Sequence, residues 1–214
     1  MMYCPKLHEE NRIEVLHQLI RDYPLGTLVV MGEGELIANA VPFYLDVNRG
    51  ECGTLFAHIS RANPLWQLPE TDVSALIIFQ GPQAYISPSW YPSKTEHGKA
   101  VPTWNYVVVQ ARGKVKFVHD RDWLLAHVSE LSKTHEINRN EPWHVDDAPK
   151  DFIERLLNGI VGMEIPLEKI VGKWKVSKDR PMLDKQGVIK GLSEAGSQYE
   201  LMMANLITQH IVHE

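Results

Sequence analysis

Residues 25–60, LGTLVVMGEGELIANAVPFYLDVNRGECGTLFAHIS, decide the fold class of this chain. This stretch contains three short runs with strand character, at 25–31, 35–45 and 53–60. The turn signals GEG and NRG separate the three runs. Short strands punctuated at this interval are typical of an antiparallel sheet or barrel and not of βαβ units.

The rest of the chain continues this pattern and adds helices. Further strands are predicted at 73–81, 84–87, 103–113, 114–120 and 162–177. Helices are predicted at 12–23, 121–134 and 149–158, the first because its apolar residues recur at helical spacing before Pro24. The sequence therefore predicts a mainly β fold with flanking helices.

The C-terminal segment 193–214 reads as a helical extension of a domain that covers residues 1–192. Gly187, Gly191 and Gly196 precede the predicted helix of this segment and indicate turns or loops. Ser197 and Glu200 have the spacing of a capping box, which marks a helix start. An apolar stripe follows at Tyr199, Met202, Met203, Leu206 and Ile207. Such a stripe docks on its own domain or binds a partner.

Composition predicts a globular protein with one core. The chain has 214 residues, 44% of them hydrophobic, and a net charge of −5, so no global attraction to nucleic acid is expected. Cys4 and Cys52 form no CxxC pair and suit a reducing compartment. The first twelve residues lack an apolar signal core, and no apolar run is long enough to span a bilayer. We therefore expect a cytoplasmic protein without membrane contact.

The stretch TLFAHISRANPLW, residues 54–66, contains a candidate anion site. His58 and Ser60 share one face of the predicted strand, which ends near Ser60. Asn63 followed by Pro64 predicts a helix start, where orphan amides and the guanidinium of Arg61 favour an anion. The alternative interpretation is a capped surface turn with a solvated arginine.

A second candidate is GKWKVSKDR at 172–180. On a strand, Lys173, Lys175 and Ser177 line one face, a row that suits a phosphate or an electron-rich ring edge. Five cations and one anion lie between Lys169 and Arg180, the most basic stretch of the chain. The alternative interpretation is a solvated face, which is what a run of charges usually forms.

Other common site types find no support in the sequence. The ten histidines include no H-E-x-x-H, and THEINRNEPWHVDD at 134–147 has no recognised ligand spacing, so no metal site is expected. There is no G-x-S-x-G, no G-x-G-x-x-G after a strand and no Walker-type lysine loop. A nucleotide-like cofactor would therefore bind by a mode other than the Rossmann or P-loop motif.

Several compositionally unusual blocks resemble one known family. They are RDYPLGTLVV, AHISRANPLW, FQGPQAYISPSWYPSK, VPTWNY, EPWHVDDAP, IVGMEIPLEKIVGKWKVS and GVIKGL. Together they resemble the PaiB family, the FMN-binding negative transcriptional regulators, from Tyr3 to about Leu192. One departure is the stretch after Ser177, where Lys178 and Asp179 replace two amides of the family pattern, so neither is assigned to the site.

The resemblance implies a fold, an assembly and a cofactor. The fold is an FMN-binding split barrel, a six-stranded antiparallel Greek-key barrel with flanking helices. Proteins of this superfamily are typically homodimers that bind FMN where two barrels meet. In its pyridoxamine-phosphate oxidases a Ser-Arg pair at a strand end holds the FMN phosphate, and Ser60-Arg61 resembles that pair.

On this resemblance the cofactor-binding candidates fall into groups by chemistry. Ser60, Arg61 and Asn63 would bind the phosphate. The pyrimidine edge of the flavin ring would bind hydrogen-bond donors and acceptors, and its apolar end would pack against an aromatic ring. A cation near the carbonyl edge would favour the anionic reduced flavin. The remaining candidates are Asn39, His58, Thr103, Trp104, Asn105, Lys173 and Lys175. Alternation along the strand places Trp104 on the opposite face from Thr103 and Asn105.

Four functions compete at this point. The first is an FMN-binding homodimer that acts as a transcriptional regulator, and the second is a flavin-dependent oxidoreductase acting on a small substrate. The third is direct DNA binding through Lys169–Arg180, which the net charge does not favour. The fourth is a haem-binding split barrel with His58 as the axial candidate.

Overall fold

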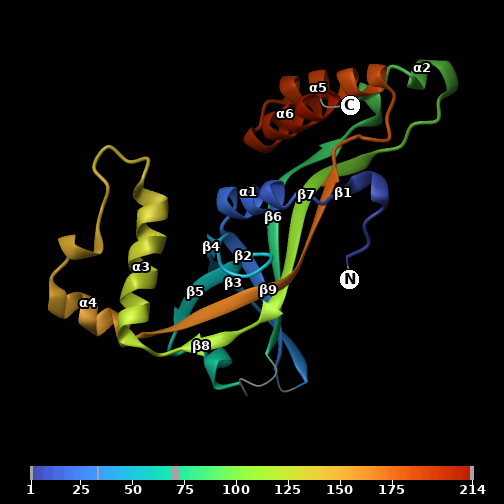
Figure 1. Cartoon of the computed structure of the whole chain (residues 1–214). Helices are drawn as coiled ribbons and strands as arrows, with labels where there is room; N and C mark the ends of the chain where they lie inside the picture. Colours follow the sequence, from blue (N-terminus) through green and yellow to red (C-terminus); the bar gives the residue numbers. More distant parts are fainter. Residues whose placement is uncertain (1, 33, 69–72, 213–214) are drawn as a thin grey trace. The chain divides into compact units, whose positions relative to one another are not determined.

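The structure is a computed structural model that describes residues 2–32, 34–68 and 73–212 (Figure 1). It divides into two compact units. The central unit comprises residues 17–79 and 110–170, and the terminal unit comprises 1–16, 80–109 and 171–214. Three long strands and one helix contribute residues to both units. The turn predicted at 32–34 includes Glu33, which lies outside the described residues.

Nine strands form the sheet in the described part of the chain. They are β1 (Glu9–Glu10), β2 (Leu25–Gly32), β3 (Glu35–Pro42), β4 (Tyr44–Asp46), β5 (Thr54–Ser60), β6 (Ser74–Ile86), β7 (Thr103–Lys114), β8 (Lys116–Val118) and β9 (Ile160–Lys175). Their order is β3-β2-β6-β7-β9-β5-β4, while β1 and β8 pair with β9. The predicted mainly β class is confirmed.

The expected number of six strands is wrong, and the length of β9 explains the difference. This strand has 16 residues and four partners: it lies next to β7 and pairs antiparallel with β1, β5 and β8. The two-residue β1 is too short to leave a pattern in the sequence, whereas the three-residue β8 lies inside the run predicted at 114–120. The runs 73–81 and 84–87 are one strand, β6, and not two.

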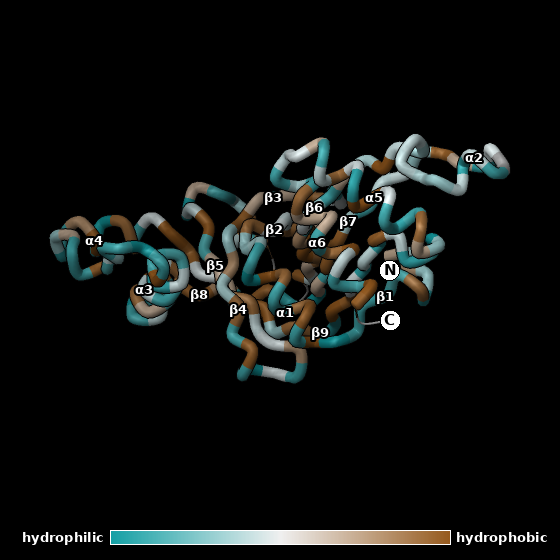
Figure 2. Tube along the Cα trace, turned by 90° about the horizontal axis from the view of Figure 1, so that it is seen from above, coloured by the Kyte–Doolittle hydropathy of each residue, from teal (hydrophilic) through white to brown (hydrophobic). Residues whose placement is uncertain are grey.

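Helix α3 (Arg121–Glu136) of the central unit packs against its strands, and α4 (Lys150–Leu157) packs against α3. Helix α1 (Ile13–Asp22), which begins in the terminal unit, and helices α3 and α4 confirm the three predicted helices. Asp120 caps α3, because its Oδ1 accepts a hydrogen bond from Trp123 N at 2.8 Å. Figure 2 views α3 end-on and shows that it carries both hydrophilic and hydrophobic residues.

Short 3-10 helices occupy the connections. They are η1 (Lys6–His8), η2 (Pro64–Gln67), η4 (Pro88–Trp90) and η5 (Val145–Asp147). The predicted helix start at Asn63 is confirmed, but the element that follows is the four-residue η2 and not a longer helix.

The terminal unit carries three helices, α2 (Lys94–His97), α5 (Met182–Ala195) and α6 (Gln198–Val212). The sequence does not predict α5, because glycines such as Gly187 and Gly191 are typical of turns and loops. They lie inside the helix, where a side chain at either position would collide with Trp90 or its carbonyl oxygen. The tryptophan ring therefore explains Gly191, and the Trp90 carbonyl oxygen explains Gly187.

The start of α6 follows its predicted capping box. Ser197 N donates to Glu200 Oε2 at 3.0 Å, and Glu200 N lies 3.4 Å from Ser197 Oγ. Met203 and Ile207 are buried, whereas Tyr199 is half exposed. Helices α5 and α6 pack against each other (Figure 1). The predicted domain boundary at 192/193 stays a prediction. None of the helices in the described ranges is long and apolar enough to cross a membrane.

Candidate functional site

The candidate anion site lies where β5 ends, in the central unit. Strand β5 pairs with β9 up to Ser60, which lies opposite Ile160. The chain then turns, and Arg61 N donates to Gly159 O at 2.8 Å. The backbone of Arg61 is therefore held against the first residues of β9.

The guanidinium of Arg61 is anchored by main-chain carbonyls. Its Nε donates to Asn158 O at 2.9 Å, and its Nη2 donates to Ile160 O at 3.0 Å. Nη1 lies 3.4 Å from His119 Nδ1. Three of the five N–H groups thus have partners, and one N–H on each terminal nitrogen has none among the described residues.

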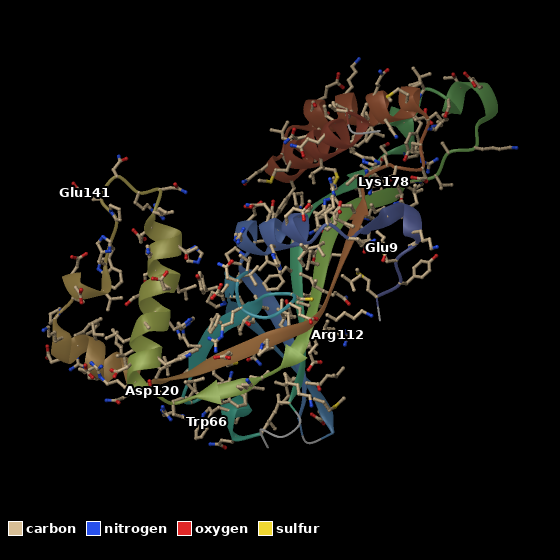
Figure 3. All side chains as sticks on the ribbon, viewed as in Figure 1. Glu9, Trp66, Arg112, Asp120, Glu141 and Lys178 are labelled. Carbon is tan, nitrogen blue, oxygen red and sulfur yellow. The ribbon has the colours of Figure 1, made fainter. Side chains whose placement is uncertain are left out.

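Trp66 completes the support of this arginine. The guanidinium carbon lies 5.7 Å from the centroid of the Trp66 ring, and Trp66 Nε1 donates to Arg61 O at 2.9 Å. The edge of the Trp66 ring packs against His119, with 5.5 Å between centroids. Figure 3 shows Trp66 close to Asp120, the residue after His119.

The other predicted phosphate ligands differ in availability. The side chain of Ser60 is exposed, and its Oγ accepts a bond from Ala62 N at 3.2 Å. Asn63 Oδ1 caps η2 through Leu65 N at 3.0 Å, while its Nδ2 donates to Asn39 Oδ1 at 3.1 Å. Asn39 and Asn63 therefore bond to each other beside a pocket of about 460 Å³.

His58 faces helix α3. Its Nδ1 lies 3.1 Å from Nε2 of His127, so one of the two nitrogens donates to the other. Burial lowers the pKa of His58, and burial together with His58 lowers the pKa of His127 to about 4. Both imidazoles are therefore neutral at pH 7.

The other candidate residues lie in the terminal unit, around the end of β9. Lys175 Nζ donates to Thr103 Oγ1 and to Trp104 O, the latter at 2.9 Å. Trp104 is 53% exposed, and its ring meets the edge of Tyr85 at 6.0 Å. Asn105 is 1% exposed, so the predicted alternation of Trp104 and Asn105 is confirmed.

Lys173 is enclosed by aromatic rings. Its Nζ lies 5.5 Å from the Tyr3 ring centroid and 5.2 Å from that of Tyr106, and it donates to Tyr3 O at 3.1 Å. The residue is 8% exposed. Its cation is therefore stabilised inside the unit and not presented to solvent.

Asn105 and Ser177 form a buried pair two residues beyond Lys175. Asn105 Nδ2 donates to Ser177 Oγ at 2.8 Å. Ser177 has a φ of 59°, a conformation that disfavours residues with a side chain. The hydrogen bond fixes the side chain of this residue inside the unit.

The structure thus groups the ten candidates into two clusters. Ser60 lies next to Arg61, Asn39 bonds to Asn63, and His58 lies on β5, all in the central unit. The other cluster lies in the terminal unit and contains Thr103, Trp104, Asn105, Lys173 and Lys175.

Sequence reasoning missed His119, His127 and Tyr106 as contacts of these residues. No local pattern marks them, because each contact joins distant parts of the chain. Among the described residues, no three His, Cys, Asp or Glu side chains are placed to hold a metal ion.

Comparison with known proteins places this chain in a family. A family model described as "Putative FMN-binding domain" matches residues 2–169. The protease synthase and sporulation protein PAI 2 of Bacillus subtilis is 31% identical over 206 residues, covering 96% of both chains. The chain belongs to the PaiB family. The resemblance of the sequence blocks between Tyr3 and about Leu192 to this family is therefore confirmed.

Solved structures similar to this PaiB-family chain confirm the fold. A conserved hypothetical protein of Mycobacterium tuberculosis aligns over 84% of this chain and 94% of its own, with a TM-score of 0.58 and 12% identity. The FAD and heme binding protein of Mycobacterium smegmatis aligns over 78% and 73%, also with a TM-score of 0.58 and 12% identity. The mainly antiparallel sheet with flanking helices is thus a fold of the split-barrel type.

Proposed function

We propose that this protein binds FMN and that Ser60 and Arg61 hold its phosphate. The observation that carries the proposal is the anchored guanidinium of Arg61, which has two N–H groups without protein partners among the described residues. Membership in a family described by FMN binding supports the same cofactor.

The chemistry of the turn suits a phosphate. A guanidinium offers paired N–H donors to phosphate oxygens, and its charge-assisted bonds are about twice as strong as neutral ones. Because Asn158 and Ile160 already fix the side chain, little conformational entropy is lost on binding. The exposed hydroxyl of Ser60 adds one more donor, next in the chain to Arg61.

In the terminal unit, Lys175 and Thr103 are the candidates for polar contact with a flavin ring. Lys175 is half buried, and its ammonium has a third N–H beyond the bonds to Thr103 and Trp104. Lys173 and Asn105 are buried and bonded to Tyr3 and Ser177, so we assign them a structural role within the unit and not contact with a ligand.

The test compares FMN with riboflavin, which lacks the phosphate. Affinities are measured by quenching of flavin fluorescence for the wild type, Arg61→Ala and Lys150→Met, an exposed cation of the same unit. Wild type and Lys150→Met should prefer FMN over riboflavin by about 100-fold, the value of one or two hydrogen bonds to a charged group. Arg61→Ala should bind both flavins alike.

Two outcomes would contradict the assignment. Equal affinity of the wild type for FMN and riboflavin would show that the protein has no phosphate site. An unchanged preference for FMN in Arg61→Ala would show that other residues bind the phosphate. The absorption spectrum of the purified protein separates flavin from haem. An axial role for His58 would have to compete with its bond to His127.

We also propose that the protein is a homodimer. Strands β2 and β3 support this, because Met31 and Leu36 face each other in register and are 59% and 71% exposed. Adjacent large apolar side chains at this level of exposure are typical of an interaction surface. Light scattering after size exclusion, with and without FMN, measures the mass. A monomer in both conditions would contradict the dimer.

We propose that this protein regulates transcription indirectly, without contact to DNA. The basic stretch Lys169–Arg180 is no continuous cationic patch, since Lys173 is buried and Arg180 lies over the ring of Tyr91 at 4.7 Å. A gel-shift assay at two salt concentrations tests this. An affinity that falls steeply with salt would show DNA contact and contradict the proposal.

A further inference from the structure

A second pocket of the central unit lies apart from the Arg61 turn. It has a volume of about 220 Å³ and is bounded by β4, β5 and α3. Its walls carry three aromatic rings, one imidazole and two carboxylates, from Tyr44, Asp46, Phe56, Trp123, His127 and Glu130. None of the six was expected from the sequence to form a site.

The aromatic walls are fixed by their own packing. The Trp123 ring stacks on His127, with centroids 5.2 Å apart and planes at 22°. Phe56 lies 6.0 Å from Trp123 and 6.1 Å from Tyr44, both in tilted contacts. Trp123 also lies directly over Gly162 of β9, where any side chain would collide with it. The rings are therefore held in place before a ligand arrives.

The charged groups around the pocket favour a cation. Asp46 and Glu130 line it, and their negative charges add to the effect of burial in raising the pKa of Tyr44. No cationic side chain is part of its lining. The nearest cation over these rings, Arg49, lies 5.3 Å from the Phe56 centroid and is paired with Glu164 at 2.9 Å.

Two exposed cations lie near this pocket without lining it. Lys133 Nζ is 3.8 Å from Glu130 Oε1, and both side chains are more than half exposed. Arg21 lines an adjoining pocket of about 280 Å³, which shares Tyr44 and Asp46 with this one. Exposed pairs of this kind exchange readily with a competing ligand cation.

His127 adds an unused polar group without adding charge. It is 6% exposed, and its Nδ1 has no hydrogen-bond partner among the described residues. A buried polar atom without a partner is uncommon in native structures and calls for an explanation. Because the imidazole stays neutral at pH 7, it does not repel a cation bound beside it.

We propose that this pocket binds a small organic ammonium ion, with its positive charge over the Tyr44 and Trp123 rings and its counter-charges at Asp46 and Glu130. Aromatic rings combined with carboxylates are the usual means of binding such a cation. The adjoining pocket, which Ile20, Pro24 and Phe43 line on its apolar side, has room for an apolar tail. This ligand site goes beyond the flavin site.

The test uses benzylammonium and benzyl alcohol, which have the same shape and differ in charge. Calorimetry at pH 7.5 should give an affinity for benzylammonium at least about tenfold higher than for the alcohol. Asp46→Asn and Glu130→Gln should each weaken benzylammonium binding by about threefold to tenfold. Asp151→Asn, which removes an exposed carboxylate on α4, should leave it unchanged.

A second readout locates the ligand. Nitrogen NMR of the histidine rings should show His127 shifting on addition of benzylammonium and His135, exposed at the end of α3, staying in place. Equal affinity for amine and alcohol, or no loss in both carboxylate variants, would overturn the proposal. Binding that disappears in about 0.3 M salt and leaves His127 unshifted would show surface charge only and overturn it as well.

The proposals of an ammonium site and of a flavin site can be refuted independently of each other. Arg61→Ala should keep its affinity for benzylammonium, since Arg61 does not line this pocket. A protein that binds FMN and no amine would refute only the ammonium site, and a protein that binds the amine and no FMN would refute only the flavin site.

Discussion

Strands β5 and β9 both end in a short cationic segment with a serine, but the two segments use their polar groups differently. At the end of β5, main-chain carbonyls hold Arg61, and two of its N–H groups are left for a ligand. At the end of β9, Lys173 is enclosed by tyrosines and Ser177 bonds to buried Asn105. The first arrangement can take up an anion, whereas the second stabilises the fold. Positive charge alone therefore does not identify a ligand site.

The largest expected effect concerns His127, which faces β5 in the same unit as Arg61. Its folded pKa of about 4 lies below the usual 6.5, so the unfolded chain binds more protons between these values. Stability is fully present above pH 6.5 and is lost as the pH falls toward 4. The loss amounts to about 3 kcal/mol, since each pKa unit corresponds to 1.36 kcal/mol.

The measurement is urea unfolding of the wild type and His127→Gln at pH 7 and pH 4.5. The wild type should lose more stability than the variant on acidification, because groups common to both cancel. His58, whose pKa burial also lowers, adds to the same trend in both proteins, while Asp46 and Glu130 on the pocket wall oppose it when charged. Parallel losses in the two proteins would show that His127 titrates normally.

The next effect tests whether the end of β9 is structural. Asn105→Ala should lower the free energy of unfolding by about 2 kcal/mol, because the Ser177 hydroxyl loses its buried partner. Thermal unfolding measures this, with Asn158→Ala as the matched control, since Asn158 is exposed and forms its hydrogen bonds through its backbone. An Asn105→Ala variant as stable as the wild type would show that this pair does not stabilise the fold and would remove the contrast with Arg61.

A smaller effect separates geometry from charge at the end of β5. Arg61→Lys keeps the cation but cannot donate to Asn158 O and Ile160 O in the same planar arrangement. We expect FMN affinity to fall about tenfold, less than in Arg61→Ala, as measured by fluorescence quenching. An affinity equal to that of the wild type would mean that charge alone holds the phosphate.

The smallest effect concerns Lys175. Lys175→Met should change stability by less than about 1 kcal/mol, because its bonds to Thr103 and Trp104 lie at a half-exposed position. If Lys175 contacts a flavin carbonyl, the reduction potential of bound FMN should fall, since the anionic reduced form loses a counter-charge. A potential equal to that of the wild type would leave Lys175 a purely structural residue.

Local pattern was sufficient to predict much of the fold. Turn residues between strands gave the antiparallel class, the capping box at Ser197 gave the start of α6, and alternation placed Trp104 and Asn105 on opposite faces. Each of these features depends on residues that are neighbours in the chain. Helix α5 was missed because its glycines compensate for Trp90, a residue far away in the sequence.

The site was predicted less completely, for the same reason. Residue type and strand end marked Ser60 and Arg61, but the carbonyls that anchor Arg61 lie 97 and 99 positions away. The pairing of His58 with His127 spans 69 positions and leaves no periodic signal. Lys173 and Lys175 look alike in sequence, and only tertiary packing makes one buried and the other half exposed.

The contact of Trp90 with α5 also determines how this part of the terminal unit unfolds. A helix with two internal glycines has low intrinsic stability, so α5 depends on the tryptophan ring that covers Gly191. The segment around Trp90 and helix α5 therefore form one cooperative unit, although almost 100 residues separate them in the chain. Their amide protons should exchange with solvent at a common rate, and Trp90→Ala should accelerate exchange throughout α5.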